Sequence, residues 1–253
     1  MAENVKLFRD AALTDEFSKD KAMYESGYDP IWAADTFNAT DGEGKNKVIY
    51  AQEIHVSNDY YYTSVQGSPV ETGANQRDPD DDAENEWHFY VAKPVEHAET
   101  AEAVGTGDDV ETEFDLDNKW VKPGSETVKV GGTTQERNVD YWICYKDGHI
   151  KFASAPGNGV AVTADYTHAD DGAGDVDVPA TGTIEANGDW TWTDLWDIPH
   201  GYDANRGTGH EKDGIPIIIR GVVDAGTTDP SGNAVTLQAQ DFKVKGWEHN
   251  AKY

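Results

Sequence analysis

The first stretch of the chain that suggests chemistry is an acidic run in which carboxylates recur at every second residue. Its alternating members are Asp78, Asp80, Asp82 and Glu84. Oxygen ligands repeat in this way in a calcium-binding loop. An EF-hand loop that starts at Asp78 needs glycine at its sixth position and glutamate at its twelfth, and these positions hold Ala83 and Phe89. The run is therefore interpreted as a solvated acidic loop without a metal.

Other groups that could do chemistry do not form a recognisable pattern. None of the eight histidines lies in an HExxH motif; His200 and His210 could hold a metal in a glycine-containing loop, but exposed loop histidines are the simpler interpretation. Cys144 is the only cysteine, so neither an intrachain disulfide nor a thiolate metal cluster is expected. The chain has no Gly-x-Ser-x-Gly elbow and no phosphate-binding loop. We expect no catalytic site, no cofactor and no metal.

Carbohydrate chemistry is the remaining candidate. A pair of carboxylates could hydrolyse a glycosidic bond, but among 48 acidic residues a pair carries no information. Trp190, Trp192 and Trp196 could stack on sugar rings, although large aromatic residues in a β domain more often belong to the core.

Acidic residues are spread along the whole chain. It has 253 residues with 20 Lys and Arg against 48 Asp and Glu, which gives a formal net charge of -28. The 8 Trp, 12 Tyr and 7 Phe provide too much apolar surface for a disordered chain. A halophilic source explains the charge, because concentrated salt screens repulsion between carboxylates. The same charge disfavours binding to nucleic acid, whose phosphates are neutralised by Lys and Arg. No apolar run approaches 18 residues, so no contact with a membrane is expected.

The stretch Val48–Gly67 has the period of two that marks a β-strand with one face on a core. Apolar residues occupy most of the even positions, namely Val48, Tyr50, Ile54, Val56, Tyr60 and Tyr62. The pattern stops at Val65–Pro69, where a long polar loop is expected to begin. Alternation resumes at Trp87–Val91, so the unit is predicted to be strand, acidic loop, strand.

A compact block of short strands and turns follows from Val104 to Ala169. Val128 and Val130 precede Gly131-Gly132, and alternation from Val139 to Tyr145 runs into Asp147-Gly148, which predicts a two-residue hairpin. A last strand is predicted at Val160–Tyr166. The block is expected to fold as a small β-sandwich.

The rest of the chain is expected to complete an all-β fold. A short helix is predicted within Lys6–Met23, in an N-terminal arm covering residues 1–47. Residues 96–103 are interpreted as a linker. Pro216 removes a ladder donor, which places it at a strand start or edge. Residues 48–103 and 170–253 are each too short for a closed barrel, so we expect one discontinuous core interrupted by the 104–169 domain.

Several of these segments resemble structural proteins of tailed viruses. The strand VIYAQEIHVSND followed by VQGSP resembles the opening hairpin of major tail tube proteins, and the segment AVTLQAQDFKVKGW resembles their closing strand. The segments PGSETVKVGG, VDYWICYKDGHIKFASAP and GVAVTADYT resemble a small β-sandwich module that recurs on tails, capsids and appendages of such viruses. The tail tube family implies a β-barrel or sandwich core, here with the short helix and the inserted domain.

The resemblance also implies a function, a location and partners. Tail tube subunits form hexameric rings that stack into a tube around a lumen through which DNA passes without specific binding. The chain would be a non-enzymatic virion protein, assembled in the host cytoplasm, that contacts itself and other tail proteins. The first strand would contact a neighbouring subunit through Tyr50, Ile54, Val56, Tyr60 and Tyr62. The loop after it would contact the next ring through Asp78, Asp80, Asp81, Asp82, Glu84 and Glu86.

Two alternatives stay open at this point. The same small module would suit a capsid decoration or turret protein of a similar virus. A protein of another class, a secreted carbohydrate-binding module, would use Trp190 and Trp192. Images of assembled particles separate the first two, because a tube subunit forms rings with a central hole.

The charge generates a prediction about salt. If the acidic surplus is halophilic adaptation, the thermal unfolding midpoint rises steeply from dilute buffer to molar KCl, since the Debye length falls to about 3 Å at 1 M. Thermal unfolding followed by circular dichroism across a KCl series measures this. A midpoint that does not change with salt would contradict the halophilic interpretation.

Overall fold

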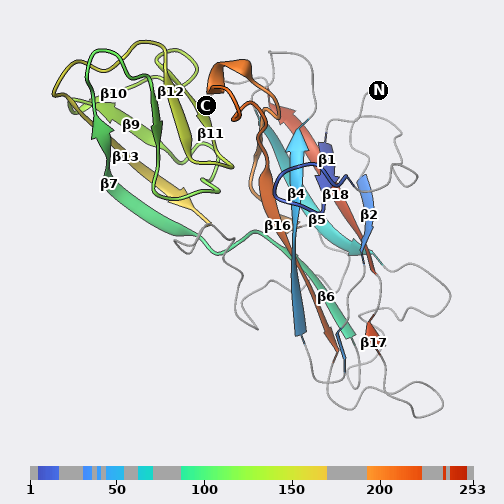
Figure 1. Cartoon of the computed structure of the whole chain (residues 1–253). Coiled ribbons are helices and arrows are strands. Elements are labelled where there is room, and N and C mark those ends of the chain that lie inside the picture. Colours follow the sequence, from blue (N-terminus) through green and yellow to red (C-terminus); the bar gives the residue numbers. More distant parts are fainter. Residues whose placement is uncertain are drawn as a thin grey trace, which may run out of the picture.

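The chain is built of β-strands in two groups of sheets (Figure 1). The computed structural model describes residues 5–16, 31–35, 39–40, 44–53, 62–70, 87–169, 193–223, 236–237 and 240–249. In this part the one helical element is a single 3-10 turn, η2 (Ala204–Arg206), and no helix has the length and apolar character needed to cross a bilayer. The all-β fold class predicted from the sequence is confirmed.

One of the larger sheets has four antiparallel strands in the order β1-β4-β16-β6. Their bounds are Val5–Phe8 for β1, Gly44–Glu53 for β4, Ile215–Val223 for β16 and Trp87–Ala92 for β6. Ile217 and Ile218 are both fully buried. Because neighbouring residues of a strand point to opposite faces, β16 is covered on both sides at this point.

The other larger sheet has the order β14-β5-β18-β2, and β15 also pairs with β5. Its strands are β14 (Thr193–Asp194), β15 (Ile198–Pro199), β5 (Tyr62–Val70), β18 (Gln240–His249) and β2 (Ile31–Asp35). A two-stranded ladder joins β3 (Ala39–Thr40) to β17 (Thr236–Leu237). In both larger sheets, strands that precede the small sandwich in sequence pair with strands that follow it.

The small sandwich packs a four-stranded sheet, β10-β9-β13-β7, against a three-stranded sheet, β11-β12-β8. The strands are β7 (His97–Thr106), β8 (Glu113–Asp115), β9 (Thr127–Val130), β10 (Thr133–Thr134), β11 (Tyr141–Cys144), β12 (His149–Phe152) and β13 (Ala161–His168). Its core is aliphatic and aromatic and includes Val128, Ile143, Ile150 and Val162. Burial alternates along β13, as a period of two requires.

Turn residues of the small sandwich lie where the sequence predicted them. Gly131 and Gly132, with φ of +58° and +81°, connect β9 to β10. The β11–β12 hairpin forms, but its connection has four residues, Tyr145–Gly148, because the last ladder pair is Cys144 with His149. At Gly148 φ is +69° and a Cβ would lie 2.2 Å from the carbonyl oxygen of Asn118, so only glycine fits.

Pro216 also lies where its chemistry requires. It is the second residue of β16 and pairs with Tyr50 of β4. The other neighbour, β6, pairs with β16 only from Ile218 onward. At Pro216 the strand therefore has one partner, and the missing N–H breaks no ladder.

Several other sequence expectations were wrong. A helix was expected within Lys6–Met23. The described residues of this segment form strand β1 and turns instead, because Val5–Phe8 pairs with β4. The polar loop expected to begin at Val65–Pro69 does not begin there, because these residues lie inside β5, where β18 supplies a continuous ladder. The single strand expected over Val48–Gly67 is represented by two strands, β4 and β5, in different sheets. The linker expected at residues 96–103 is mostly strand β7, which begins at His97, ahead of the boundary expected at Val104.

Candidate functional site

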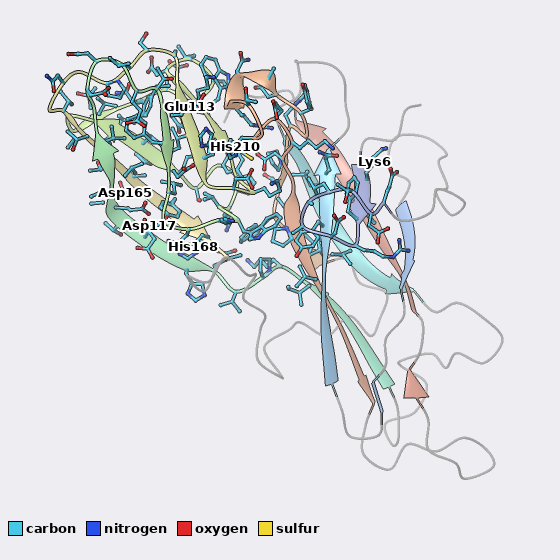
Figure 2. All side chains as sticks on the ribbon, viewed as in Figure 1. Lys6, Glu113, Asp117, Asp165, His168 and His210 are labelled. Atoms are coloured by element: carbon cyan, nitrogen blue, oxygen red, sulfur yellow. The ribbon has the colours of Figure 1, made fainter. Side chains whose placement is uncertain are left out.

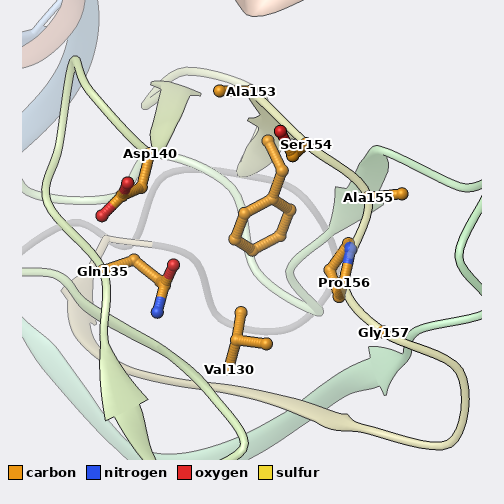
Figure 3. Close-up of a pocket in the computed structure, with 9 residues that line it drawn as sticks. Val130, Gln135, Asp140, Ala153, Ser154, Ala155, Pro156 and Gly157 are labelled. Atoms are coloured by element: carbon orange, nitrogen blue, oxygen red, sulfur yellow. The ribbon is translucent and has the colours of Figure 1, made fainter.

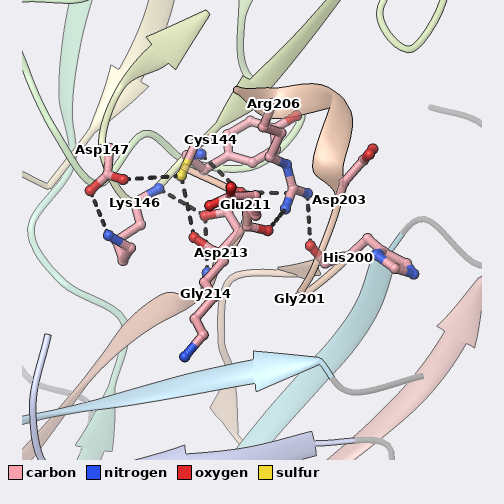
Figure 4. A network of polar contacts seen from close by, with 12 residues as sticks. Cys144, Lys146, Asp147, His200, Gly201, Asp203, Arg206, Glu211, Asp213 and Gly214 are labelled. Atoms are coloured by element: carbon pink, nitrogen blue, oxygen red, sulfur yellow. Dashed lines mark hydrogen bonds and ion pairs between the residues drawn. The ribbon is translucent and has the colours of Figure 1, made fainter. Parts of the chain in front are cut away.

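A polar joint connects the small sandwich to the larger sheets, and we define it as the contact between the β11–β12 hairpin and the loop 200–214 (Figure 4). This loop links β15 to β16 and folds back on itself. The Asp203 side chain accepts from Asn205 N and caps η2. Backbone bonds from Asp203 N to Glu211 O and from Asp213 N to Gly201 O, both 2.9 Å, close the loop.

Asp213 is at the centre of the joint and has no exposed surface. Its Oδ2 accepts from Tyr145 N at 2.9 Å, and its Oδ1 accepts from Lys146 N at 2.8 Å and Gly214 N at 2.9 Å. These first two amides belong to the β11–β12 connection. One carboxylate therefore replaces the strand partner that the connection lacks, which explains why the turn is longer than two residues.

Arg206 brings the opposite charge to Asp213. It is 5% exposed, and its Nη2 lies 3.6 Å from Asp213 Oδ2. The same Nη2 donates to His200 O at 2.7 Å, and Nη1 donates to Glu211 O at 3.4 Å. Burial raises the pKa of Asp213, while Arg206 and the three N–H donors oppose the rise. A buried carboxylate is tolerated here because every partner is in place.

Beside this pair lies a second polar cluster, formed by Cys144, Asp147 and His210. Cys144 Sγ lies 3.4 Å from Asp147 Oδ2, and His210 Nδ1 lies 2.9 Å from the same oxygen. Burial raises the pKa of the Cys144 thiol well above its usual value, and the carboxylates of Asp213 and Asp147 raise it further. Burial and the neighbouring carboxylate charges disfavour the thiolate, so this arrangement does not activate Cys144 as a nucleophile.

Asp147 remains ionised despite its burial. Burial disfavours the charged form, but hydrogen bonds from Lys146, His210 and Cys144, together with the charge of Lys146, lower the pKa of Asp147 overall. Lys146 Nζ lies 2.5 Å from Asp147 Oδ1, which leaves Oδ2 to face the cysteine and the histidine.

Aromatic contacts extend the joint away from the polar clusters. The rings of Tyr50 in β4 and Trp120 stack with centroids 5.0 Å apart. Trp120 is buried with φ at +51°, a region that bulky residues rarely adopt. Trp196 is also buried, and its Nε1 donates to Glu96 Oε1 at 2.9 Å. Trp196 therefore contributes to packing and offers no face for a sugar.

Most residues predicted as contact sites lie outside the described residues. These are Ile54, Val56 and Tyr60 of the first stretch and Asp78, Asp80, Asp81, Asp82, Glu84 and Glu86 of the acidic loop. Tyr62 is the first residue of β5, and Tyr50 lies in β4 against Trp120.

The joint residues Cys144, Arg206 and Asp213 were not predicted from the sequence. His210 was considered with His200 as a possible metal ligand but was interpreted as an exposed loop residue. Cys144 gave one usable signal. It lies at an even position of the alternating stretch 139–145, whose odd positions hold the apolar residues. Cys144 therefore faces away from the sandwich core, and it is nevertheless completely buried. A cysteine at that position indicates that another segment covers the outer face of β11.

The small sandwich also has a pocket, which is less suited than the joint to bind a ligand. It encloses about 270 Å³ and is lined by Val130, Phe152 and the segment 153–157, together with two polar side chains (Figure 3). Both of these are already bonded to backbone: Gln135 donates to Thr133 O, and Asp140 accepts from Glu136 N. Because both side chains already have hydrogen-bond partners within the chain, neither indicates a bound ligand.

Comparison with known proteins adds one relative. No protein family matches the chain, and no solved structure matches it. An uncharacterized protein of Methanocaldococcus jannaschii is 37% identical over 68 residues. The match covers 26% of this chain and 29% of that relative, so the chain spans less than a third of the relative's length.

The role of Asp213 generates a prediction. Asp213→Ala leaves the amides of Tyr145 and Lys146 without an acceptor and Arg206 without a counter-charge. Removing one partner from a buried charged pair costs about 3–5 kcal/mol. Urea unfolding at constant molar KCl should show a loss of this size in the free energy of unfolding.

A matched control is Asp108→Ala. Asp108 also accepts two backbone N–H groups, from Val110 and Glu111, but it is exposed. Its replacement should therefore have a much smaller effect, because water can take over the bonds. Equal effects of the two substitutions would contradict the central role of Asp213.

Proposed function

We propose that the chain is a virion structural protein, the tail tube subunit of a tailed virus that infects a halophilic archaeon. The observation that carries the proposal is the placement of the segments that resemble tail tube proteins. The first supplies β4, which lies between β1 and β16. The last supplies β18, which lies between β5 and β2. The resemblance therefore falls on interior strands, around which both larger sheets are built.

The sheets also offer surfaces suited to ring formation. Within the described residues, β6 and β2 are edge strands of the two larger sheets. An edge strand has unpaired N–H and C=O groups along one side and can pair with a strand of another chain. A ring of subunits joined through such edges would cover the open sides of β6 and β2.

The small sandwich fits the proposal as an appendage. It lies to one side of the larger sheets and contacts them through the joint (Figure 1). On the outside of a tube, the small sandwich would be attached to the tube wall and would not line the lumen. The net charge of -28 suits a lumen through which DNA slides, because acidic surfaces do not attract phosphate.

The test is electron microscopy of the purified full chain in molar KCl, at several protein concentrations. We expect rings with a central hole that stack into tubes as the concentration rises. Monomers at every salt and protein concentration would contradict the proposal. Particles that bind capsid shells and never stack would instead identify a decoration protein.

The acidic loop generates a further prediction within this proposal. Opposite charges across an interface control association rate and register more than affinity. A variant with Asp78 and Asp81 replaced by Asn, and Asp80 and Asp82 by Ser, should therefore keep its melting temperature but stack more slowly or out of register. Light scattering gives the rate, and micrographs give the ring spacing.

The control removes exposed carboxylates from the small sandwich, at Glu111, Asp117 and Glu136. This variant changes the net charge by a similar amount and should stack like the unmodified chain. If the acidic-loop variant also stacks with unchanged rate and spacing across a salt series, the loop has no role between rings.

A further inference from the structure

The cluster of Cys144, Asp147 and His210 joins a soft donor, a carboxylate and an imidazole from two separate parts of the chain. Cys144 ends β11, Asp147 lies in the hairpin connection, and His210 comes from the loop 200–214. One potential ligand atom from each residue lies within 4.8 Å of the other two. In Figure 2, His210 lies between the small sandwich and the larger sheets.

The spacing of these atoms is close to that of a tetrahedral metal site. Zinc binds sulfur at about 2.3 Å, nitrogen at about 2.0–2.1 Å and carboxylate oxygen at about 2.0–2.2 Å, so neighbouring ligand atoms lie roughly 3.4–3.6 Å apart. Asp147 Oδ2 is 3.4 Å from Cys144 Sγ and 2.9 Å from His210 Nδ1. The third separation, between Cys144 Sγ and a ring nitrogen of His210, is within 4.8 Å, so rearrangement of the three side chains would bring all three atoms to coordination distance.

A further oxygen ligand is available at the same place. The carbonyl oxygen of Lys212 lies 3.4 Å from Cys144 Sγ, on the side of the loop that also supplies His210. It gives the cluster a fourth donor, which a closed structural site requires. Lys146 is bound to the other oxygen of Asp147, so it neutralises part of the local charge without occupying Oδ2.

The surroundings fix the histidine ligand in place. The His149 ring stacks on His210 with centroids 3.8 Å apart and planes 10° from parallel. His149 is in turn held by Asp115, whose Oδ1 lies 2.7 Å from His149 Nδ1. The buried His149 Nε2 makes no hydrogen bond and lies 3.7 Å from Glu113 Oε2. The stacked His149 ring, itself held by Asp115, therefore limits the orientations open to the His210 ring.

We propose that Cys144, Asp147, His210 and the carbonyl of Lys212 bind a divalent transition-metal ion of the zinc type. Thiolate and imidazole donors select such ions over Mg²⁺ and Ca²⁺, which prefer oxygen ligands. Binding replaces the thiol proton by the metal and releases that proton to solvent, while the proton on His210 Nδ1 moves to Nε2. The thiolate and the carboxylate then balance the charge of the ion.

The bound ion would cross-link the small sandwich to the larger sheets. Two of its side chains belong to the hairpin, and its other two donors belong to the loop 200–214. An ion that binds the folded form and not the unfolded chain stabilises the joint in proportion to its saturation. This inference does not depend on the tail tube proposal, because it concerns contacts within one chain.

Cobalt(II) is a suitable probe because a thiolate bound to it gives a sulfur-to-metal charge-transfer absorption. The full chain, stripped with a chelator and kept in molar KCl, is titrated with Co²⁺ and then with Zn²⁺. We expect one Co²⁺ per chain with a charge-transfer band, displacement by Zn²⁺, and a rise in the melting temperature. Since the chain has a single cysteine, the band reports Cys144 alone.

Variants separate the site from binding to surface carboxylates. Cys144→Ser abolishes the charge-transfer band while preserving the size of the side chain, and His210→Gln reduces cobalt affinity at least tenfold. His97→Gln, at the start of β7, is the matched histidine control and leaves binding unchanged. Circular dichroism in the same buffer verifies that each variant is folded.

Two results would overturn the proposal. One is Co²⁺ binding by the folded chain with no charge-transfer band, which would mean carboxylate binding only. The other is a band and an affinity that are the same in His210→Gln as in the unmodified chain, which would mean that the loop does not contribute a ligand.

Discussion

The burial of the Asp213 carboxylate is the constraint on which the arrangement of the two groups of sheets depends. It accepts hydrogen bonds from two amides of the β11–β12 connection and from Gly214, and it faces Arg206. A buried charge is costly unless each of its partners is present. We infer that only one placement of the small sandwich satisfies the carboxylate, so the joint specifies the geometry more than it adds stability.

The rest of the joint follows from this contact. With Tyr145 and Lys146 bound to the carboxylate, the hairpin connection lengthens and brings Cys144 and Asp147 toward the loop. The loop in turn brings His210 against His149. The Tyr50–Trp120 stack then adds apolar contact between β4 and the small sandwich.

The sequence predicted best where structure is set by neighbouring residues. The alternation along Val160–Tyr166, the glycine pair at Gly131 and the hairpin at Gly148 each depend on local backbone geometry, and each is present. Prediction failed where a distant strand decides. Val5–Phe8 carries no strong strand pattern but pairs with β4, and Val65–Pro69 has turn-forming residues but pairs with β18.

The candidate site was missed for the same physical reason. Asp213 and its partner Tyr145 are 68 residues apart in sequence, and His210 lies 63 residues from Asp147. No local period or spacing connects such residues.

The joint also bears on the proposed assembly. The small sandwich is attached through a buried carboxylate, an aromatic stack and a candidate metal site. It would therefore move together with the larger sheets. In a tube of stacked rings, such an appendage would present a fixed outer surface. A flexible tether would give a different particle, in which the small sandwiches take many orientations.

Amide hydrogen exchange at Tyr145 and Lys146 tests the central role of the joint most directly. These two amides have no strand partner, and their acceptor is Asp213 on the other part of the chain. Measured by NMR in molar KCl, both should be protected nearly as well as the amides of Leu116 and Phe152, which donate to Gly148 O and Thr112 O at 2.8 Å. Exchange as fast as at the exposed turn residue Gly132 would show that the joint opens freely, and would contradict the account.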